Sequence, residues 1–184
     1  MDIDNARRVM QEWTKSEALR IHMEAVALCM GAYAQKLSPD EHDRWFAAGL
    51  LHDFDYEKHP SEEEHPFVGV AYLRTLNVDE EILSAILGHA EYTGTPRESS
   101  MAKVLFAVDE LAGFLVACAK VRPQGVVDLA PKSVKKKLKD KRFAAAVSRD
   151  DIRNGCEELG VDLTEHIELC IDALRSRATE LGVG

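Results

Sequence analysis

The sequence contains few cysteines, which could crosslink a small domain, and few glycines and prolines, which interrupt helices and strands. Only 11 glycines and 6 prolines occur among its 184 residues, which excludes a collagen-like or low-complexity chain. The few cysteines form no Cys-x-x-Cys pair and lie within apolar stretches, so we expect buried free thiols rather than disulfides or a thiolate metal site. These cysteines are Cys29, Cys118, Cys156 and Cys170.

Long uncharged apolar runs are also lacking, and basic residues are outnumbered. The longest apolar stretch, residues 102–121, carries four charged side chains and is therefore too polar to cross a bilayer. The first residues, Met-Asp-Ile-Asp, have neither the basic nor the apolar region of a secretory signal, so we expect a cytoplasmic protein. With 23 basic and 32 acidic residues the net charge is −9, which argues against a nucleic-acid or anionic-membrane binder.

Hydrophobic residues, at 46% of the chain, recur mostly with a helical period, and no run alternates with the period of a strand. Cap residues mark several of the starts, such as Ser16 and Asp79. We therefore predict an all-α protein with a domain over residues 1–122 and a helical C-terminal extension, 123–184, packed on that domain. The expected helices cover residues 16–37, 38–54, 61–77, 79–91, 99–122 and 163–181.

One segment differs from the rest in charge. Residues 132–153 hold nine basic and three acidic residues. The segment is either a solvated helix face or a cover over a binding site, in which Lys135, Lys136 and Lys137 bind substrate phosphates. Nucleic acid is a weaker alternative, because few aromatic residues interleave the charges.

Four polar residues occupy places where apolar ones are expected. His22 and Asp109 lie on the apolar faces of their helices, and His52 with Asp53 ends the run Ala-Ala-Gly-Leu-Leu. Taken singly, each fits a simpler role: a histidine bonded to a backbone carbonyl, a helix cap, or a carboxylate paired with a nearby arginine or lysine. A buried carboxylate is costly unless it is paired or binds a metal. Two histidines and two aspartates facing one core are a suitable ligand set for a divalent cation.

The order His22, His52-Asp53, Asp109 on successive helices resembles the HD-domain superfamily of metal-dependent phosphohydrolases. The resemblance covers residues 16–115 and includes the segments Leu-Leu-His-Asp and Ala-Val-Asp-Glu-Leu. It implies an HD-domain helical bundle in which these four residues ligate one metal ion, with His52 and Asp53 at the catalytic centre.

Two further histidines are similar to those of HD subfamilies that hold two metals, among them symmetrical diadenosine-tetraphosphate hydrolases and cyclic-di-nucleotide phosphodiesterases. The resemblance implies that Asp53 bridges the ions and that His65 and His89 complete the second site. The alternative is that both histidines simply lie at helix ends. His89 is followed by alanine rather than a second histidine, and a Gly-Tyr-Pro signature is missing, which argues against cyclic dinucleotides. His42 and His166 we expect to be solvated surface residues.

The resemblance therefore predicts hydrolysis of a small phosphate ester, a nucleotide or dinucleotide, by metal-activated water. One or two divalent ions (Fe, Mn, Co, Mg or Zn) are expected, and no general acid can be assigned among the polar residues 55–59. Two alternatives remain open: an HD-type diiron oxygenase with the same ligands, and a non-catalytic metal-stabilised sensor or interaction module. We expect a small phosphorylated partner and no membrane, and the oligomeric state, including a homo-oligomer, is left open.

Overall fold

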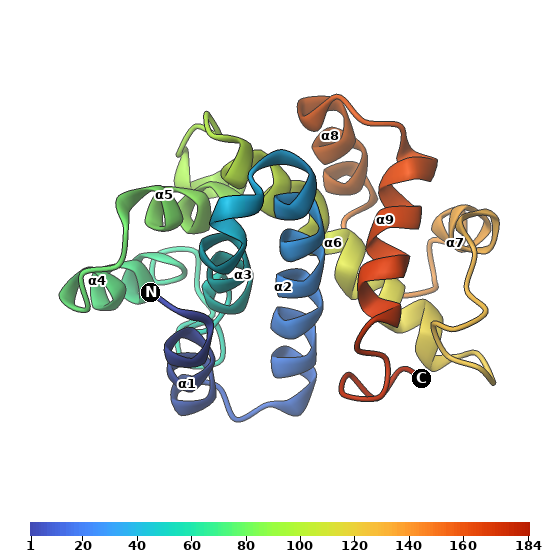
Figure 1. Ribbon diagram of the computed structural model, residues 1–184, viewed down its shortest axis with the longest axis horizontal. Coiled ribbons are helices and arrows are strands. Elements are labelled where there is room, and N and C mark those ends of the chain that lie inside the picture. Colours follow the sequence, from blue (N-terminus) through green and yellow to red (C-terminus); the bar gives the residue numbers. More distant parts are fainter.

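The computed structural model describes residues 1–184 as nine α-helices and two short 3-10 helices, with no strand (Figure 1). The prediction of an all-α chain is therefore confirmed. None of the helices is both long enough and apolar enough to cross a membrane. The helices are α1 (Ile3–Trp13), α2 (Glu17–Leu37), η1 (Pro39–Glu41), α3 (His42–Leu51), α4 (Phe67–Thr75), α5 (Glu80–His89), η2 (Glu91–Thr93), α6 (Ser100–Lys120), α7 (Pro131–Leu138), α8 (Arg149–Leu159) and α9 (Leu163–Arg175).

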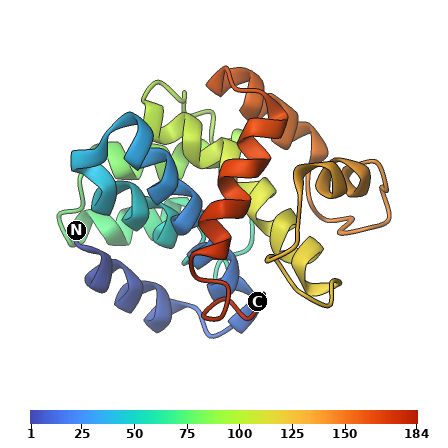
Figure 2. The same ribbon diagram turned by 45° about the vertical axis from the view of Figure 1, so that its right-hand side comes forward.

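Two 21-residue helices, α2 and α6, form the centre of the fold and pack on each other. Helices α1, α3, α4 and α5 lie to one side of α2, and α7, α8 and α9 lie to the other (Figure 1). The last of these, α9, runs across the front of the molecule in Figure 2, against α2 and α6. The two central helices therefore separate the N-terminal helices from the C-terminal ones and contact both sets.

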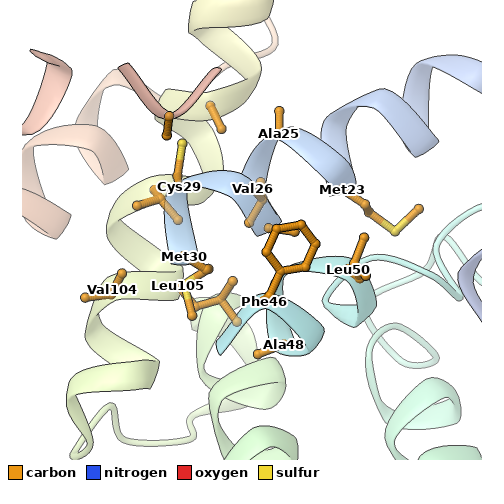
Figure 3. Packing of buried hydrophobic residues seen from close by; sticks show 14 of the residues in the cluster. Met23, Ala25, Val26, Cys29, Met30, Phe46, Ala48, Leu50, Val104 and Leu105 are labelled. Carbon is orange, nitrogen blue, oxygen red and sulfur yellow. The ribbon is translucent and has the colours of Figure 1, made fainter. Parts of the chain in front are cut away.

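One hydrophobic core joins the two sets of helices. Figure 3 shows Val26 and Met30 of α2, Phe46 of α3 and Leu105 of α6 meeting in its middle. The same cluster continues into the C-terminal helices through Val134, Ile152 and Ile167. Burial of each large apolar side chain stabilises the fold by about 1.5–3 kcal/mol before the entropy of ordering is subtracted.

The closest approach of α2 and α3 depends on a glycine. A Cβ atom at Gly49 would lie 2.5 Å from the Cα atom of Ala27, so no other residue fits there without moving a helix. This contact brings the end of α3, which is followed by His52 and Asp53, against α2, which carries His22.

Several helix starts follow the local sequence as predicted. Ser16, Asp79 and Ser99 are the N-caps of α2, α5 and α6, and each side chain accepts a hydrogen bond from a backbone N–H in the first turn. The predicted loop between Pro123 and Pro131 is also present, because α7 begins at Pro131.

Three helix boundaries differ from the prediction, and α1 is an additional helix. Helix α3 ends at Leu51, and residues 52–58 continue as turns. Helix α4 begins only at Phe67, because the proline before it disfavours a helical conformation in the preceding residue. Helix α9 ends at Arg175 rather than near residue 181. Helix α1 was not predicted, although Asp2 caps it by the same side-chain hydrogen bond as the others.

Candidate metal centre

All six predicted metal ligands meet at one place in the fold. They come from α2, from the end of α3 and the turn after it, from the residue pair that precedes α4, from the last turn of α5 and from the middle of α6. These residues are His22, His52, Asp53, His65, His89 and Asp109. The long distances between them in the sequence are closed by the packing of α2, α3, α5 and α6 on one another.

One group of ligand atoms surrounds the Nε2 atoms of His22 and His52, which lie 3.1 Å apart. The Oδ1 atom of Asp109 lies 3.0 Å from the first nitrogen and 3.3 Å from the second. The Oδ2 atom of Asp53 lies 3.6 and 3.5 Å from the same two nitrogens. We call these four residues the first ligand group.

A second group forms around the other oxygen of the same aspartate. The Oδ1 atom of Asp53 lies 3.3 Å from Nε2 of His65 and 3.4 Å from Nε2 of His89, and these nitrogens are 3.3 Å apart. We call Asp53, His65 and His89 the second ligand group. The carboxylate of Asp53 is therefore shared, with one oxygen facing each group.

The far ring nitrogens of three of these histidines are already engaged. Nδ1 of His52 donates to the carbonyl oxygen of Gly49, 2.8 Å away, and Nδ1 of His89 donates to the carbonyl of Ile86. Nδ1 of His65 lies 2.8 Å from Oδ1 of Asp55. Such partners fix the ring orientation and leave Nε2 with its lone pair available for a metal.

The electrostatics of the ion-free centre show how strongly it attracts positive charge. Burial opposes a charge on His52, but Asp53 and Asp109 outweigh it and raise its pKa to about 9. The pKa of His65 also rises to about 9, because hydrogen bonds to Asp53 and Asp55 outweigh its burial. Burial likewise opposes the charge of Asp53 and Asp109, yet the neighbouring histidines hold the pKa of both carboxyl groups well below the usual range.

The spacing of the ligand atoms fits a metal site. Two atoms that are each about 2.1 Å from one ion lie about 3.0 Å apart at a right angle and about 3.4 Å apart at the tetrahedral angle. The separations of the histidine nitrogens from one another and from the carboxylate oxygens run from 3.0 to 3.6 Å within the two groups. Imidazole nitrogen and carboxylate oxygen also form the donor set that borderline and hard divalent ions prefer.

The centre is open on one side. The side chains of His22, Asp53 and Asp109 are 21%, 17% and 18% exposed, whereas those of His52 and His65 are almost completely buried. A small molecule can therefore approach the carboxylates from solvent, while His52 and His65 lie on the buried side.

Comparison with known families agrees with this geometry. The HD-domain model matches residues 19–113, just over half of the chain, and this range contains all six residues of the two ligand groups. The chain therefore belongs to the HD-domain family, whose members are mostly metal-dependent hydrolases. Searches of curated proteins and of solved structures gave no significant match.

The carboxylate of Asp109 pairs with histidines rather than with an arginine. Arg7 instead pairs with Glu24, with its Nε atom 2.6 Å from a carboxylate oxygen. Arg20 donates to the backbone carbonyls of Gln11 and Thr14. The partners of Asp109 are thus the two histidines of the first ligand group.

The three lysines predicted to bind substrate lie on α7, which packs against α9 and α6. Nζ of Lys135 donates to Thr164 of α9, and Nζ of Lys137 lies 4.3 Å from the centre of the Phe143 ring. Lys135 lines a surface hollow of about 830 Å³ together with other basic side chains. None of these contacts reaches the two ligand groups.

One histidine was predicted wrongly. His166, expected at the surface, is only 1% exposed. Its Nε2 donates to the carbonyl of Ala107 and its Nδ1 accepts from the hydroxyl of Tyr33, so the ring is neutral and burial lowers its pKa. The long-range contact of α9 with α2 and α6 buries it, which the local run Thr-Glu-His-Ile-Glu does not reveal.

His42 is partly exposed beside Asp43, and the four cysteines are free and buried as predicted.

Sequence reasoning left two neighbours of the centre without a role. Asp55 is completely buried and bonded to His65. Tyr92, which is 45% exposed, donates from its hydroxyl to the backbone carbonyl of His65. The one signal for Asp55 in the sequence is its place two residues after Asp53, among several other polar residues that are exposed.

Proposed function

We propose that the protein is a metal-dependent phosphohydrolase that acts on a small phosphate ester, with nucleotides and dinucleotides as the favoured substrates. The observation that carries the proposal is the shared carboxylate of Asp53, which has one oxygen in each ligand group. Two metal ions joined by one carboxylate are a common arrangement in enzymes that hydrolyse phosphate esters.

Each residue of the centre has a distinct task in this proposal. Asp53 would hold both ions, and His52, fixed by Gly49, would hold the first ion on the buried side. When bound, divalent ions supply a water of lowered pKa and polarise a phosphoryl oxygen. The open side at His22, Asp53 and Asp109 leaves room for the phosphate group to reach that water.

The charges of the centre favour an anionic substrate. Histidines bind a metal as neutral rings, so Asp53 and Asp109 would be the only charged ligands of a loaded centre, and they would balance two of the four positive charges of a pair of divalent ions. The positive excess would attract a phosphate and stabilise the charge that develops on it during hydrolysis.

Substrate binding by Lys135, Lys136 and Lys137 remains a proposal that rests on their charge. The variant with glutamine at all three positions should raise KM for the phosphate substrate several-fold at an unchanged kcat. Steady-state kinetics at constant ionic strength measures both values. An unchanged KM would show that these lysines do not bind the substrate.

The test of function is a panel of phosphate monoesters, phosphodiesters and dinucleoside polyphosphates, each with Mn²⁺, Co²⁺ or Fe²⁺. Turnover that chelation abolishes, and that is absent from an Asp53→Ala preparation purified in parallel, would support the proposal. Silence for every compound would overturn it. In that case, oxygen uptake by the iron-loaded protein would indicate an oxygenase. A protein that retains metal but shows neither hydrolysis nor oxygen uptake would be a non-catalytic module.

A further inference from the structure

Asp55 is a fully buried carboxylate that is not one of the predicted metal ligands. It is 0% exposed and makes no ion pair with a lysine or arginine. Its Oδ1 atom lies 2.8 Å from Nδ1 of His65, and its Oδ2 atom accepts the backbone N–H of Gly69 at 2.7 Å. A carboxylate in such a place is costly unless its partners compensate the loss of water.

We propose that Asp55 is a positioning residue that fixes the ring orientation and the tautomer of His65, so that Nε2 of His65 is available to the second of two metal ions. The inference rests on the proposed dinuclear centre and extends it beyond the residues that touch the ions. Carboxylates in this position orient metal-binding histidines and increase their basicity.

The hydrogen bonds around Asp55 allow one assignment only. The N–H of Gly69 can only donate, so Oδ2 is an acceptor. A carboxylate has no donor of its own, so Nδ1 of His65 carries the proton that is shared with Oδ1. Nε2 is then the nitrogen that faces Asp53, 3.3 Å away, and its lone pair would serve an ion held between the two residues.

His65 needs such a partner because no helix carbonyl serves it. His52 and His89 each donate to the carbonyl three residues earlier in their own helix. His65 stands in a turn segment before α4, in which its backbone N–H donates to the carbonyl of Ser61, but its Nδ1 meets Asp55 rather than a carbonyl of that segment. Asp55, from the segment after α3, takes the place of that carbonyl.

The packing at Gly69 is adapted to this carboxylate. A Cβ atom at Gly69 would lie 2.7 Å from both Cγ and Oδ2 of Asp55, and 2.7 Å from the ring of Phe54. The start of α4 can therefore lie this close to Asp55 only because residue 69 is a glycine. Asp55 thus links the segment that carries Asp53 to the segment that carries His65.

Asparagine at position 55 has the same shape but cannot satisfy both partners. If its amide oxygen faces Gly69, its NH₂ group points at Nδ1 of His65, which must then accept, and the ring proton moves to Nε2, where it blocks the second ion. If the amide oxygen faces His65 instead, the NH₂ group faces the N–H of Gly69. Both groups are hydrogen-bond donors, so neither is satisfied. Both arrangements weaken the second ion and leave the first ligand group untouched.

The experiment compares Asp55→Asn with the wild type and with Thr14→Val. Thr14 is buried, and its hydroxyl donates to the carbonyl of Phe54 in the same turn, so its loss loosens the turn without changing the partner of His65. Equilibrium dialysis against Mn²⁺ with elemental analysis measures the ions bound per chain. We expect two ions in the wild type and in Thr14→Val, and a second ion bound 10–100-fold more weakly in Asp55→Asn.

Several outcomes would overturn the proposal. If Asp55→Asn binds both ions as tightly as the wild type, Asp55 does not position His65. If Thr14→Val loses the second ion to the same extent as Asp55→Asn, the loss comes from the loosened turn and not from the partner of His65. A wild type that binds a single ion would exclude the dinuclear centre, and the role of Asp55 with it. Nitrogen NMR of the zinc-loaded wild type gives a test that needs no variant: Nδ1 of His65 must carry the proton, and ligation through Nδ1 would refute the assignment.

Discussion

Replacing Asp53 with alanine should abolish the response of the protein's stability to divalent metal while leaving the helices folded. Its two oxygens lie 3.3–3.6 Å from four histidine nitrogens, so the change removes one ligand from each group at once. The residues that pack α2, α3 and α6 together are unchanged, which is why we expect a folded protein.

The size of the effect follows from ligand linkage. A metal at 100 times its Kd stabilises the folded wild type by about 2.7 kcal/mol. In a chain of this length, each kcal/mol shifts the Tm by about 2–4 °C, so the wild type should gain roughly 5–11 °C. The Asp53→Ala variant should gain close to nothing.

The ion-free variant should also be less stable than the ion-free wild type near pH 7. The rise in the pKa of His65 from 6.5 to about 9 represents about 3 kcal/mol of favourable interaction at about 1.4 kcal/mol for each pKa unit. Asp53 shares this interaction with Asp55, so a loss on the order of 1–3 kcal/mol is expected.

The assay is a thermal melt followed by circular dichroism, with chelator or with Mn²⁺. Asp40→Ala is a matched control, because Asp40 is an exposed aspartate of η1 that shares no hydrogen bond or ion pair with either ligand group. It should keep the full metal response of the wild type. A metal-induced rise in Tm that is equal in the wild type and in Asp53→Ala would refute the conclusion that Asp53 is a ligand.

Two further predictions concern the same centre. His89→Ala should reduce the ions per chain from two to one and lower turnover without unfolding α5, because His89 belongs only to the second ligand group; elemental analysis that still finds two ions, with full turnover, would contradict this assignment. In the ion-free protein, the raised pKa values of His52 and His65 stabilise the fold only while these rings are protonated. Their contribution to the free energy of unfolding should therefore be complete at pH 6 and should be lost as the pH rises through about 9. Urea denaturation between pH 6 and pH 9.5 measures this loss, and a flat profile would show that the rings are not paired as described.

Local sequence was sufficient for most of the helices and for the first ligand group. The N-caps at Ser16, Asp79 and Ser99 are formed by side chains within three residues of the backbone groups that they bind, so their effect is visible in the sequence. His22 and Asp109 could be found as candidates because each interrupts an apolar helix face, and such an interruption needs a partner inside the protein.

The local sequence does not determine the helix boundaries near the centre. The predicted helix over residues 38–54 ends at Leu51, and residues 52–58 form turns, which let Asp53 face both ligand groups while Asp55 faces His65. Similar turns replace the first part of the predicted helix over residues 61–77. In both places a few long-range contacts outweigh a helical preference that is worth only a fraction of a kcal/mol per residue.

Composition, helical period and caps thus determined an all-α chain and marked His22, His52, Asp53 and Asp109 as candidate ligands. His65 and His89 were added only through the resemblance to the HD-domain superfamily. Tertiary structure alone decided which carboxylate is buried behind a histidine, which histidine lies in the core and where the basic segment packs. Asp55 and Glu57 occupy the same polar turn in the sequence, yet the approach of Gly69 buries the first and leaves the second exposed. His166 is buried because α9 lies against α2 and α6. Such outcomes depend on contacts between residues that are distant in the sequence, and a pattern confined to one helix carries no information about them.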